Sequence, residues 1–269
     1  MIERILLFLN SLTMPVPQAW GWFHVLCVML SAGSVGLFIV ARRKGIQIAP
    51  DRVFAWYGFS ALLLELTKQL MWSVHETDGT VIWAYSWYSA PFQFCTMPLY
   101  LSLVLCFVKN KRVRDFLYSF LAFYSVISMT LVMLFPGNVF TEYTVINIHT
   151  MVLHGGGFVV ALFVLINRLT DFSLKSVLRG AAVFLCLAGT ALAMDVLVER
   201  SGINHGAEFN MFYISPYYPC RLPVLSRIQE LVPYPLFLLT YILSVCFGSI
   251  LVLGIVKGIS RLRRREEQI

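Results

Sequence analysis

Seven apolar segments, each about 20 residues long, restrict the fold of this sequence more than any other feature. They span residues 20–41, 53–72, 90–108, 116–135, 145–166, 177–198 and 234–256. Roughly 20 apolar residues are needed for one helix to cross the hydrocarbon core of a bilayer. Only 13% of the 269 residues are charged, too few to cover the surface of a soluble domain of this size. The sequence therefore predicts an all-α, polytopic membrane protein with a bundle of seven transmembrane helices.

The charges between these segments predict how the bundle is oriented. Basic residues follow the first, third, fifth and seventh segments, whereas the opposite loops carry few. Cytoplasmic loops of membrane proteins are enriched in Lys and Arg, so we expect an outside N-terminus and a cytoplasmic C-terminus in the cell membrane. The net charge of +7 fits this orientation and does not indicate nucleic-acid binding.

The chain divides into three parts on this reading. Residues 1–19 form an N-terminal interfacial segment with a short helix, 20–258 the seven-helix domain, and 259–269 a charged cytoplasmic tail. The outer connection 200–233 is long and rich in aromatic residues and prolines, so we expect it to lie over the outer mouth as a lid. The six cysteines show no C-x-x-C pair and no zinc spacing, and we predict no metal site and no cofactor.

Polar residues inside the predicted spans indicate where function resides, because such groups are costly in hydrocarbon. Glu65 and Lys68 are three residues apart on one helical face and predict a structural ion pair. The other polar residues of the spans lie in the first, third, fifth and sixth segments, mostly near the outer surface: His24, Gln93, Cys95, Thr96, Asn147, His149, His154 and Asp195. This asymmetry indicates a cavity that opens toward the outer leaflet.

Cys95 and His154 are the candidate catalytic residues. With a rise of about 1.5 Å per residue, Cys95 lies roughly 8–10 Å and His154 roughly 13 Å below the outer ends of their spans. A neighbouring imidazole favours the thiolate, which is the nucleophilic form of cysteine. The opposing interpretations are inert packing, which is usual for a cysteine in an apolar span, and a disulfide with Cys220 of the outer loop. The glycines at 155–157 permit close approach of either a helix or a lipid chain.

Four short segments resemble a known family. They are Pro91-Phe-Gln-Phe-Cys95, His149-Thr-Met-Val-Leu-His154-Gly-Gly, Asn210-Met-Phe-Tyr213 followed by Pro216, and Val232-Pro-Tyr-Pro235. In this order they are similar to YwaF-type bacterial integral membrane proteins and, more distantly, to the transmembrane protein 164 acyltransferases of eukaryotes. The match runs from about residue 20 to 256. The chain departs from the family at Asn210-Met-Phe, where the family has Asn-aromatic-Met, and it lacks the Trp-Pro-Trp form.

The resemblance implies that the eukaryotic relatives move acyl chains on phospholipids through a cysteine, and that related enzymes hydrolyse fatty-acid esters. We therefore expect Cys95 to attack an acyl ester of an outer-leaflet lipid, with His154 as general base. Membrane lipids are the expected partners, as acyl donor and acceptor. Gln93, Asn147 or Asn210 is expected to donate a hydrogen bond to the oxyanion. His149 or Asp195 is expected to orient the imidazole of His154.

Two other classes of protein fit the same residues. In a transporter or lipid-binding protein, Glu65, Lys68, His154 and Asp195 would line a pathway or pocket without covalent catalysis. Secondary transporters usually show internal repeats and binding sites at mid-membrane, and this sequence shows neither feature. In a structural subunit the polar residues would only pack helices, and Cys95 and His154 would lie too far apart to interact.

Overall fold

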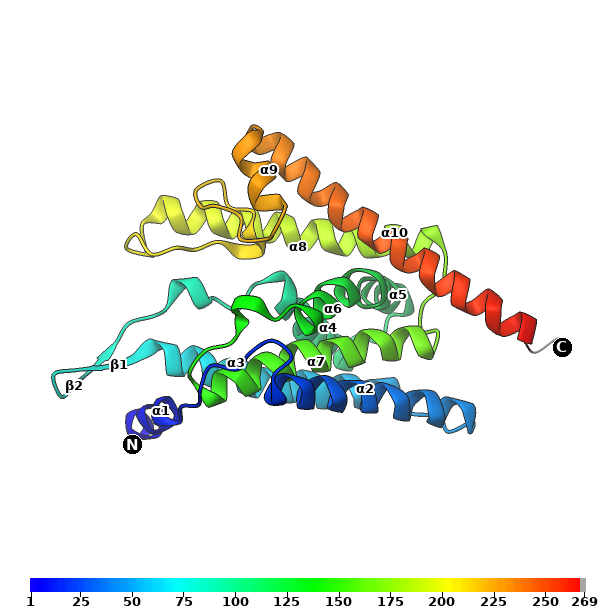
Figure 1. Cartoon of the computed structure of the whole chain (residues 1–269). Coiled ribbons are helices and arrows are strands. Elements are labelled where there is room, and N and C mark those ends of the chain that lie inside the picture. The colour runs from blue at the N-terminus through cyan, green and yellow to red at the C-terminus, as the bar shows by residue number, and fades with distance from the viewer. Residues whose placement is uncertain (267–269) are drawn as a thin grey trace.

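The computed structural model describes residues 1–266, and these residues are mainly helical (Figure 1). The helices are α1 (Ile2–Ser11), α2 (Trp22–Arg43), α3 (Pro50–Ser73), α4 (Met97–Phe107), α5 (Lys111–Phe120), α6 (Val126–Leu134), α7 (Thr144–Ile166), α8 (Leu174–Ser201), α9 (Leu225–Leu231) and α10 (Tyr234–Glu266). Short helical turns are η1 (Trp87–Ser89), η2 (Phe94–Thr96), the π-helical η3 (Leu121–Ser125), η4 (Gly137–Val139) and η5 (Met211–Tyr213). Strands β1 (Val74–Thr77) and β2 (Thr80–Trp83) form an antiparallel hairpin between α3 and η1.

Local signals in the sequence account for several helix ends. Pro50 stands in the first turn of α3, where its missing N–H costs no hydrogen bond. The Asn110 side chain accepts hydrogen bonds from the N–H groups of Arg112 and Val113 and so caps α5. The last helix of the bundle differs from the expectation, because α10 continues as far as Glu266 into the predicted tail 259–269. Residues 267–269 of that tail lie outside the described residues.

Each of the seven predicted spans coincides with helical structure, and five described helical segments are long and apolar enough to cross a membrane. These five are 22–43, 111–134, 144–166, 174–201 and 234–262. Helix α3 is long, but Asp51, Arg52, Glu65 and Lys68 lower its apolar character. The third predicted span is helical only over Phe94–Phe107. At 1.5 Å per residue that helix rises about 21 Å, less than the hydrocarbon core, because residues 90–93 enter it in a non-helical conformation.

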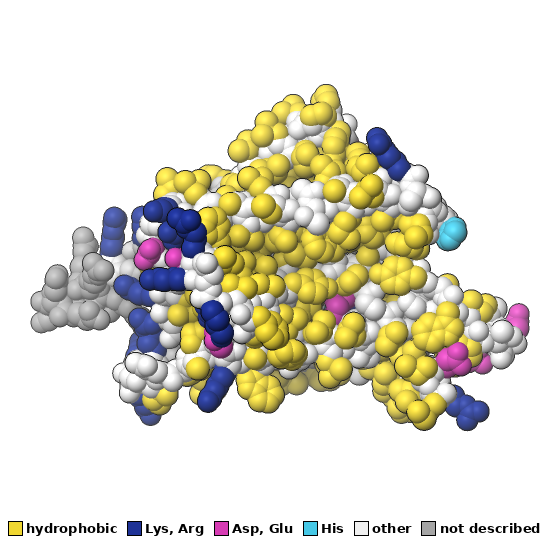
Figure 2. Space-filling model, turned by 180° about the vertical axis from the view of Figure 1, so that it is seen from behind, with side chains coloured by type: hydrophobic (Ala, Val, Ile, Leu, Met, Phe, Trp, Pro, Cys, Tyr) yellow, Lys and Arg dark blue, Asp and Glu magenta, His cyan; other side chains and the backbone are white. Residues whose placement is uncertain are grey.

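Helix α7 occupies the middle of the bundle, where it packs against α2, α3 and α6. About 67% of its apolar window is buried inside the protein, against 6% for α2 and 22% for α8 and α10. The latter helices therefore present their apolar side chains outward. Figure 2 shows a broad apolar surface along the bundle, with Lys and Arg side chains gathered at one end. This is the surface expected of a multi-pass membrane protein.

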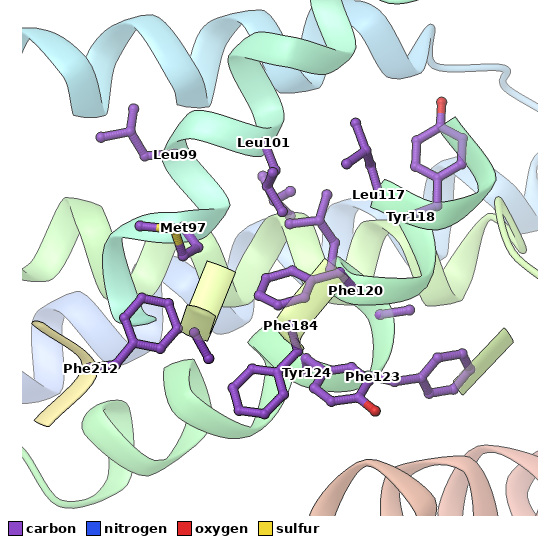
Figure 3. Close-up of a cluster of buried hydrophobic side chains, with 14 of the residues drawn as sticks. Met97, Leu99, Leu101, Leu117, Tyr118, Phe120, Phe123, Tyr124, Phe184 and Phe212 are labelled. Carbon is purple, nitrogen blue, oxygen red and sulfur yellow. The ribbon is translucent and has the colours of Figure 1, made fainter. Parts of the chain in front are cut away.

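An aromatic cluster fills the core between α5, η3 and α8 (Figure 3). The rings of Phe120 and Tyr124 stack with centroids 5.8 Å apart, and Tyr124 stacks on Phe184 of α8 at 5.6 Å. Phe94 of η2 and Phe212 of η5 join this cluster with ring centroids 5.5 Å apart. The core thus anchors two turns that lie far apart in the sequence, and both of them belong to the polar region described below.

Arg114 connects three helices at the basic end of the bundle. Its guanidinium donates to the carbonyls of Leu105 (2.7 Å) and Val108 (3.0 Å) at the end of α4. It also pairs with Asp51 at the start of α3 and bonds the Tyr118 hydroxyl. The carbonyls at the C-terminus of α4 have no partner within that helix, so Arg114 supplies the donors they need.

Replacing Arg114 by methionine is expected to lower the free energy of unfolding by roughly 2–3 kcal/mol, because hydrogen bonds from a charged donor contribute more than neutral ones. Thermal unfolding in detergent micelles measures the change. Lys109→Gln is the matched control, since Lys109 pairs with the same Asp51 but is 73% exposed, and exposed pairs contribute little. Equal stability of the two variants would contradict a clamp at Arg114.

Candidate functional site

His154 lies on the buried side of α7, with one ring nitrogen bonded and one free of protein partners. The side chain is 6% exposed. Its Nδ1 lies 2.7 Å from the carbonyl oxygen of Thr150, one turn earlier in the helix. Because a carbonyl only accepts, Nδ1 carries the proton and Nε2 presents its lone pair. Among the described residues, no hydrogen-bond partner of Nε2 is found, so this nitrogen is available as a base.

Cys95 lies in η2, the first turn of the helix that continues as α4. Tight hydrogen bonds shape the turn: the Gln93 N–H donates to Thr96 Oγ1 (3.0 Å), and this hydroxyl donates to the Gln93 carbonyl (2.7 Å). The Tyr100 hydroxyl donates to the Pro91 carbonyl (2.8 Å) and holds the preceding residues against the helix. Turn η2 packs against α7, so the segments that carry the thiol and the imidazole are neighbours.

A buried polar cluster centred on Glu65 lies beside these two segments. The Glu65 carboxylate is 2% exposed and accepts from Lys68 Nζ (2.7 Å) and Gln69 Nε2 (2.8 Å) at Oε1. His149 Nε2 lies 2.7 Å from Oε2. Gln69 Nε2 also donates to the carbonyl of Ser89, 2.7 Å away. The predicted neighbours Glu65 and Lys68 are therefore joined by two further residues, one on the central helix.

The Glu65 cluster lies close to both candidate catalytic segments. Its residues belong to α3 and α7, and α4, which continues from the turn of Cys95, packs against α3, while η2 packs against α7.

The connection 200–233, predicted to lie on the outer side, packs against this region. Met211, Phe212 and Ile214 are at most 1% exposed. Asp195 Oδ1 accepts from the Met211 N–H (2.7 Å), and Gln93 Oε1 accepts from the Phe212 N–H (2.9 Å). Phe212 has φ +56° and adopts a left-handed conformation that is unfavourable for a bulky residue. Backbone strain of this kind persists only where the surroundings enforce it, and it is concentrated at functional sites.

Most of the expected supporting residues have other structural roles. Asn147 bonds both backbone groups of Thr141, and Asn210 bonds the backbone of Pro219 and Ser215. His149 bonds Glu65, Asp195 bonds Met211, and His154 Nδ1 bonds the Thr150 carbonyl, so a role of His149 or Asp195 in orienting His154 stays a prediction. Gln69 and Thr150 were missed. Gln69 carried a weak signal, four residues after Glu65, whereas Thr150 carried none.

All six cysteines lie within the described part of the chain, and none forms a disulfide. The proposed alternative of a Cys95–Cys220 bridge is therefore absent from this structure. Cys220 is 3% exposed in the outer connection, and burial raises the pKa of its thiol. A raised pKa leaves less thiolate at neutral pH, and the thiolate is the reactive form.

We expect Cys220 to react slowly with iodoacetamide at pH 7–8, and faster as the pH rises through its elevated pKa or when the protein is unfolded. Mass spectrometry of the Cys220 peptide measures this rate. The same peptide from protein unfolded in denaturant at the same pH is the reference. Rapid modification of Cys220 in the folded protein would show that the outer connection opens readily.

These features define a class of protein: a multi-pass helical membrane protein with a buried polar centre that contains a thiol, an imidazole and an ion pair. Residues 16–253 match the model of the TMEM164 family, and the chain belongs to that family. The resemblance to this family seen in the sequence is thereby confirmed, whereas the YwaF-type label stays a prediction. No curated protein and no solved structure matches this chain.

Proposed function

We propose that this protein is an integral membrane acyltransferase or lipid transacylase that uses Cys95 as nucleophile and His154 as base. The observation that carries the proposal is the state of the His154 ring, whose Nδ1 is committed to Thr150 while Nε2 has no partner among the described residues. A neutral imidazole nitrogen that keeps its lone pair without a protein partner can accept a proton from a nearby thiol. The proximity of η2 to α7 brings the thiol-bearing turn to the same helix.

The reaction proceeds in two half-reactions. His154 Nε2 takes the proton from Cys95 Sγ, and the thiolate attacks the carbonyl carbon of an acyl ester. The ester C–O bond breaks, the leaving alkoxide receives the proton from His154, and the acyl chain stays on Sγ as a thioester. The hydroxyl of an acceptor lipid, or water, then gives its proton to Nε2 and attacks the thioester. Cys95 leaves as thiolate and recovers the proton.

The position of Cys95 in the first turn of Phe94–Phe107 supports this chemistry. The N-terminal end of a helix carries partial positive charge and free N–H groups, which favour negative charge on a thiolate and on a tetrahedral intermediate. Gln93 keeps one amide N–H beyond the bond to the Asn210 carbonyl (2.8 Å) and is the remaining side-chain candidate for the oxyanion. The amide of Asn147 is turned back onto its own chain at Thr141.

The proposal includes seven membrane spans with the N-terminus outside and the C-terminus in the cytoplasm. The short helix Phe94–Phe107 and α3 then also cross the bilayer, and the intramembrane charges of α3 at Glu65 and Lys68 are largely buried inside the bundle. The distribution of basic residues supports this orientation, since Lys and Arg gather at one end of the bundle (Figure 2). Cys95 then faces the outer leaflet, and acyl lipids of that leaflet are the substrates.

Trapping of the acyl-enzyme tests the function. Membranes that contain the protein are incubated with phosphatidylcholine carrying an alkyne-tagged acyl chain, and the label on the protein is detected before and after hydroxylamine. We expect a hydroxylamine-sensitive label on Cys95 that is absent from Cys95→Ala. Cys246→Ser is the matched control, because Cys246 is also half-buried and free. A wild-type protein that never acquires the label would refute acyl transfer through Cys95.

A further inference from the structure

The Glu65 cluster connects the two catalytic segments through an unbroken series of hydrogen bonds. His149 on α7 bonds Glu65 on α3 (2.7 Å), Glu65 bonds Gln69 (2.8 Å), and Gln69 bonds the carbonyl of Ser89 (2.7 Å). Ser89 ends η1, six residues before Cys95. His149 and His154 lie on the same helix. Glu65 and Gln69 thus join the helix of the imidazole to the segment of the thiol.

Glu65 is the centre of this network. Its carboxylate is 2% exposed and accepts hydrogen bonds from three side chains, those of His149, Lys68 and Gln69. Lys68 balances its charge at 2.7 Å, which a buried carboxylate requires. Among the described residues, no other side chain is bonded both to α7 and, through Gln69, to the segment that precedes Cys95. Loss of the carboxylate would leave the donors on three residues without their acceptor.

A simple helix-packing role does not explain the whole arrangement. The pair Glu65–Lys68 alone would satisfy both charges within α3. The bonds to His149 and, through Gln69, to Ser89 go beyond this pair and fix the position of two other segments. Two atoms at the edge of the cluster, His149 Nδ1 and Gln69 Oε1, are buried without a partner. Leaving these two atoms without hydrogen bonds is unfavourable, and the bonds to Glu65 and Ser89 keep His149 and Gln69 in these orientations despite that.

We propose that Glu65 is a positioning residue for the catalytic pair, and that it holds the helix of His154 and the turn of Cys95 in register. This inference rests on the proposed function of the pair. Glu65 does not touch the reacting atoms, so its removal misplaces the thiol and the imidazole while leaving lipid binding intact. Displacements of about 1 Å in such a pair lower rates by about 100-fold.

Glu65→Gln and Gln69→Met test this role from two points of the network. Glutamine keeps the volume of Glu65 but presents a donor to His149 Nε2 or to Lys68. We expect each variant to lower kcat for acylation by alkyne-tagged phosphatidylcholine about 10- to 100-fold, with KM within threefold of wild type. The double variant should be no slower than the slower single variant, because both changes interrupt one connection.

Asp51→Asn is the matched control. Asp51 is on the same helix and pairs with Arg114 at the opposite end, so its loss also removes a carboxylate ion pair from α3. We expect it to lower the unfolding temperature without changing kcat per folded protein. If Asp51→Asn lowers kcat as much as Glu65→Gln, or if Glu65→Gln changes only the amount of folded protein, the role of Glu65 is structural and the proposal is wrong.

A second measurement separates this inference from the proposed function. The rate of Cys95 alkylation by iodoacetamide is followed against pH by peptide mass spectrometry, which requires no acyl transfer. We expect Glu65→Gln and Gln69→Met to shift the profile toward that of His154→Asn. A shifted profile in a protein that forms no thioester would support positioning and refute acyl transfer. An unchanged profile in folded variants would overturn the positioning role.

Discussion

Replacing His154 by asparagine is expected to lower the rate of Cys95 acylation by about 10²–10⁴-fold, the range typical of losing a general base. The Thr150 carbonyl holds the Nδ1 proton and leaves Nε2 as the acceptor, so the imidazole is prepared to take a proton from the thiol. An asparagine amide retains the hydrogen bond to Thr150 but has no basic nitrogen. The time course of the hydroxylamine-sensitive acyl label on purified protein in lipid nanodiscs measures the effect.

His24 provides the matched control for that experiment. It is also fully buried, but both of its ring nitrogens are bonded: Nδ1 accepts from the Trp20 N–H (2.9 Å), and Nε2 donates to the Met133 carbonyl (3.0 Å). A histidine with both nitrogens engaged has a structural role. His24→Asn should therefore lower stability and leave acylation per folded protein unchanged. Acylation of His154→Asn at the wild-type rate would exclude the imidazole from the chemistry.

The helical segments could be predicted from the sequence because a single property, about 20 apolar residues, sets both their existence and their length. The prediction was less accurate where two properties compete. Residues 90–93 were included in the third apolar segment, but Pro91 and the bonds of the Thr96 hydroxyl keep them non-helical. The hairpin 74–83 was not predicted.

The candidate site could be predicted in part for a similar reason. The cost of polar groups in hydrocarbon singles out Glu65, Lys68 and His149 without any knowledge of their partners. The i, i+3 spacing identifies Lys68 as one partner of Glu65, but the bond to His149 spans 84 residues and depends on the packing of α3 against α7. The left-handed turn at Phe212 also has no sequence signal, since it is held by bonds that the Met211 and Phe212 N–H groups donate to the distant side chains of Asp195 and Gln93.

Gly156→Val is expected to prevent stable folding, and Gly156→Ala to lower the free energy of unfolding by about 1–3 kcal/mol, as overpacking of a core does. A Cβ atom at Gly156 would lie 2.7 and 2.8 Å from two ring carbons of Tyr57. This ring cannot withdraw freely, because it is 8% exposed and its hydroxyl donates to the Leu153 carbonyl (3.0 Å). Thermal unfolding in detergent micelles measures the loss.

Gly189→Ala is the control for the intrinsic preference of helices for alanine. A Cβ at Gly189 of α8 meets no atom within 4 Å, so this change should stabilise the helix by up to about 1 kcal/mol. The comparison also separates the two explanations for the glycine run 155–157. Ser31, Tyr57 and Met129 occupy the space beside these three glycines, which assigns the run to helix packing. If Gly156→Ala were as stable as Gly189→Ala, Tyr57 of α3 would not be in tight contact with α7 at Gly156. The close packing of α3 on α7 that brings Glu65 within reach of His149 would then be in error.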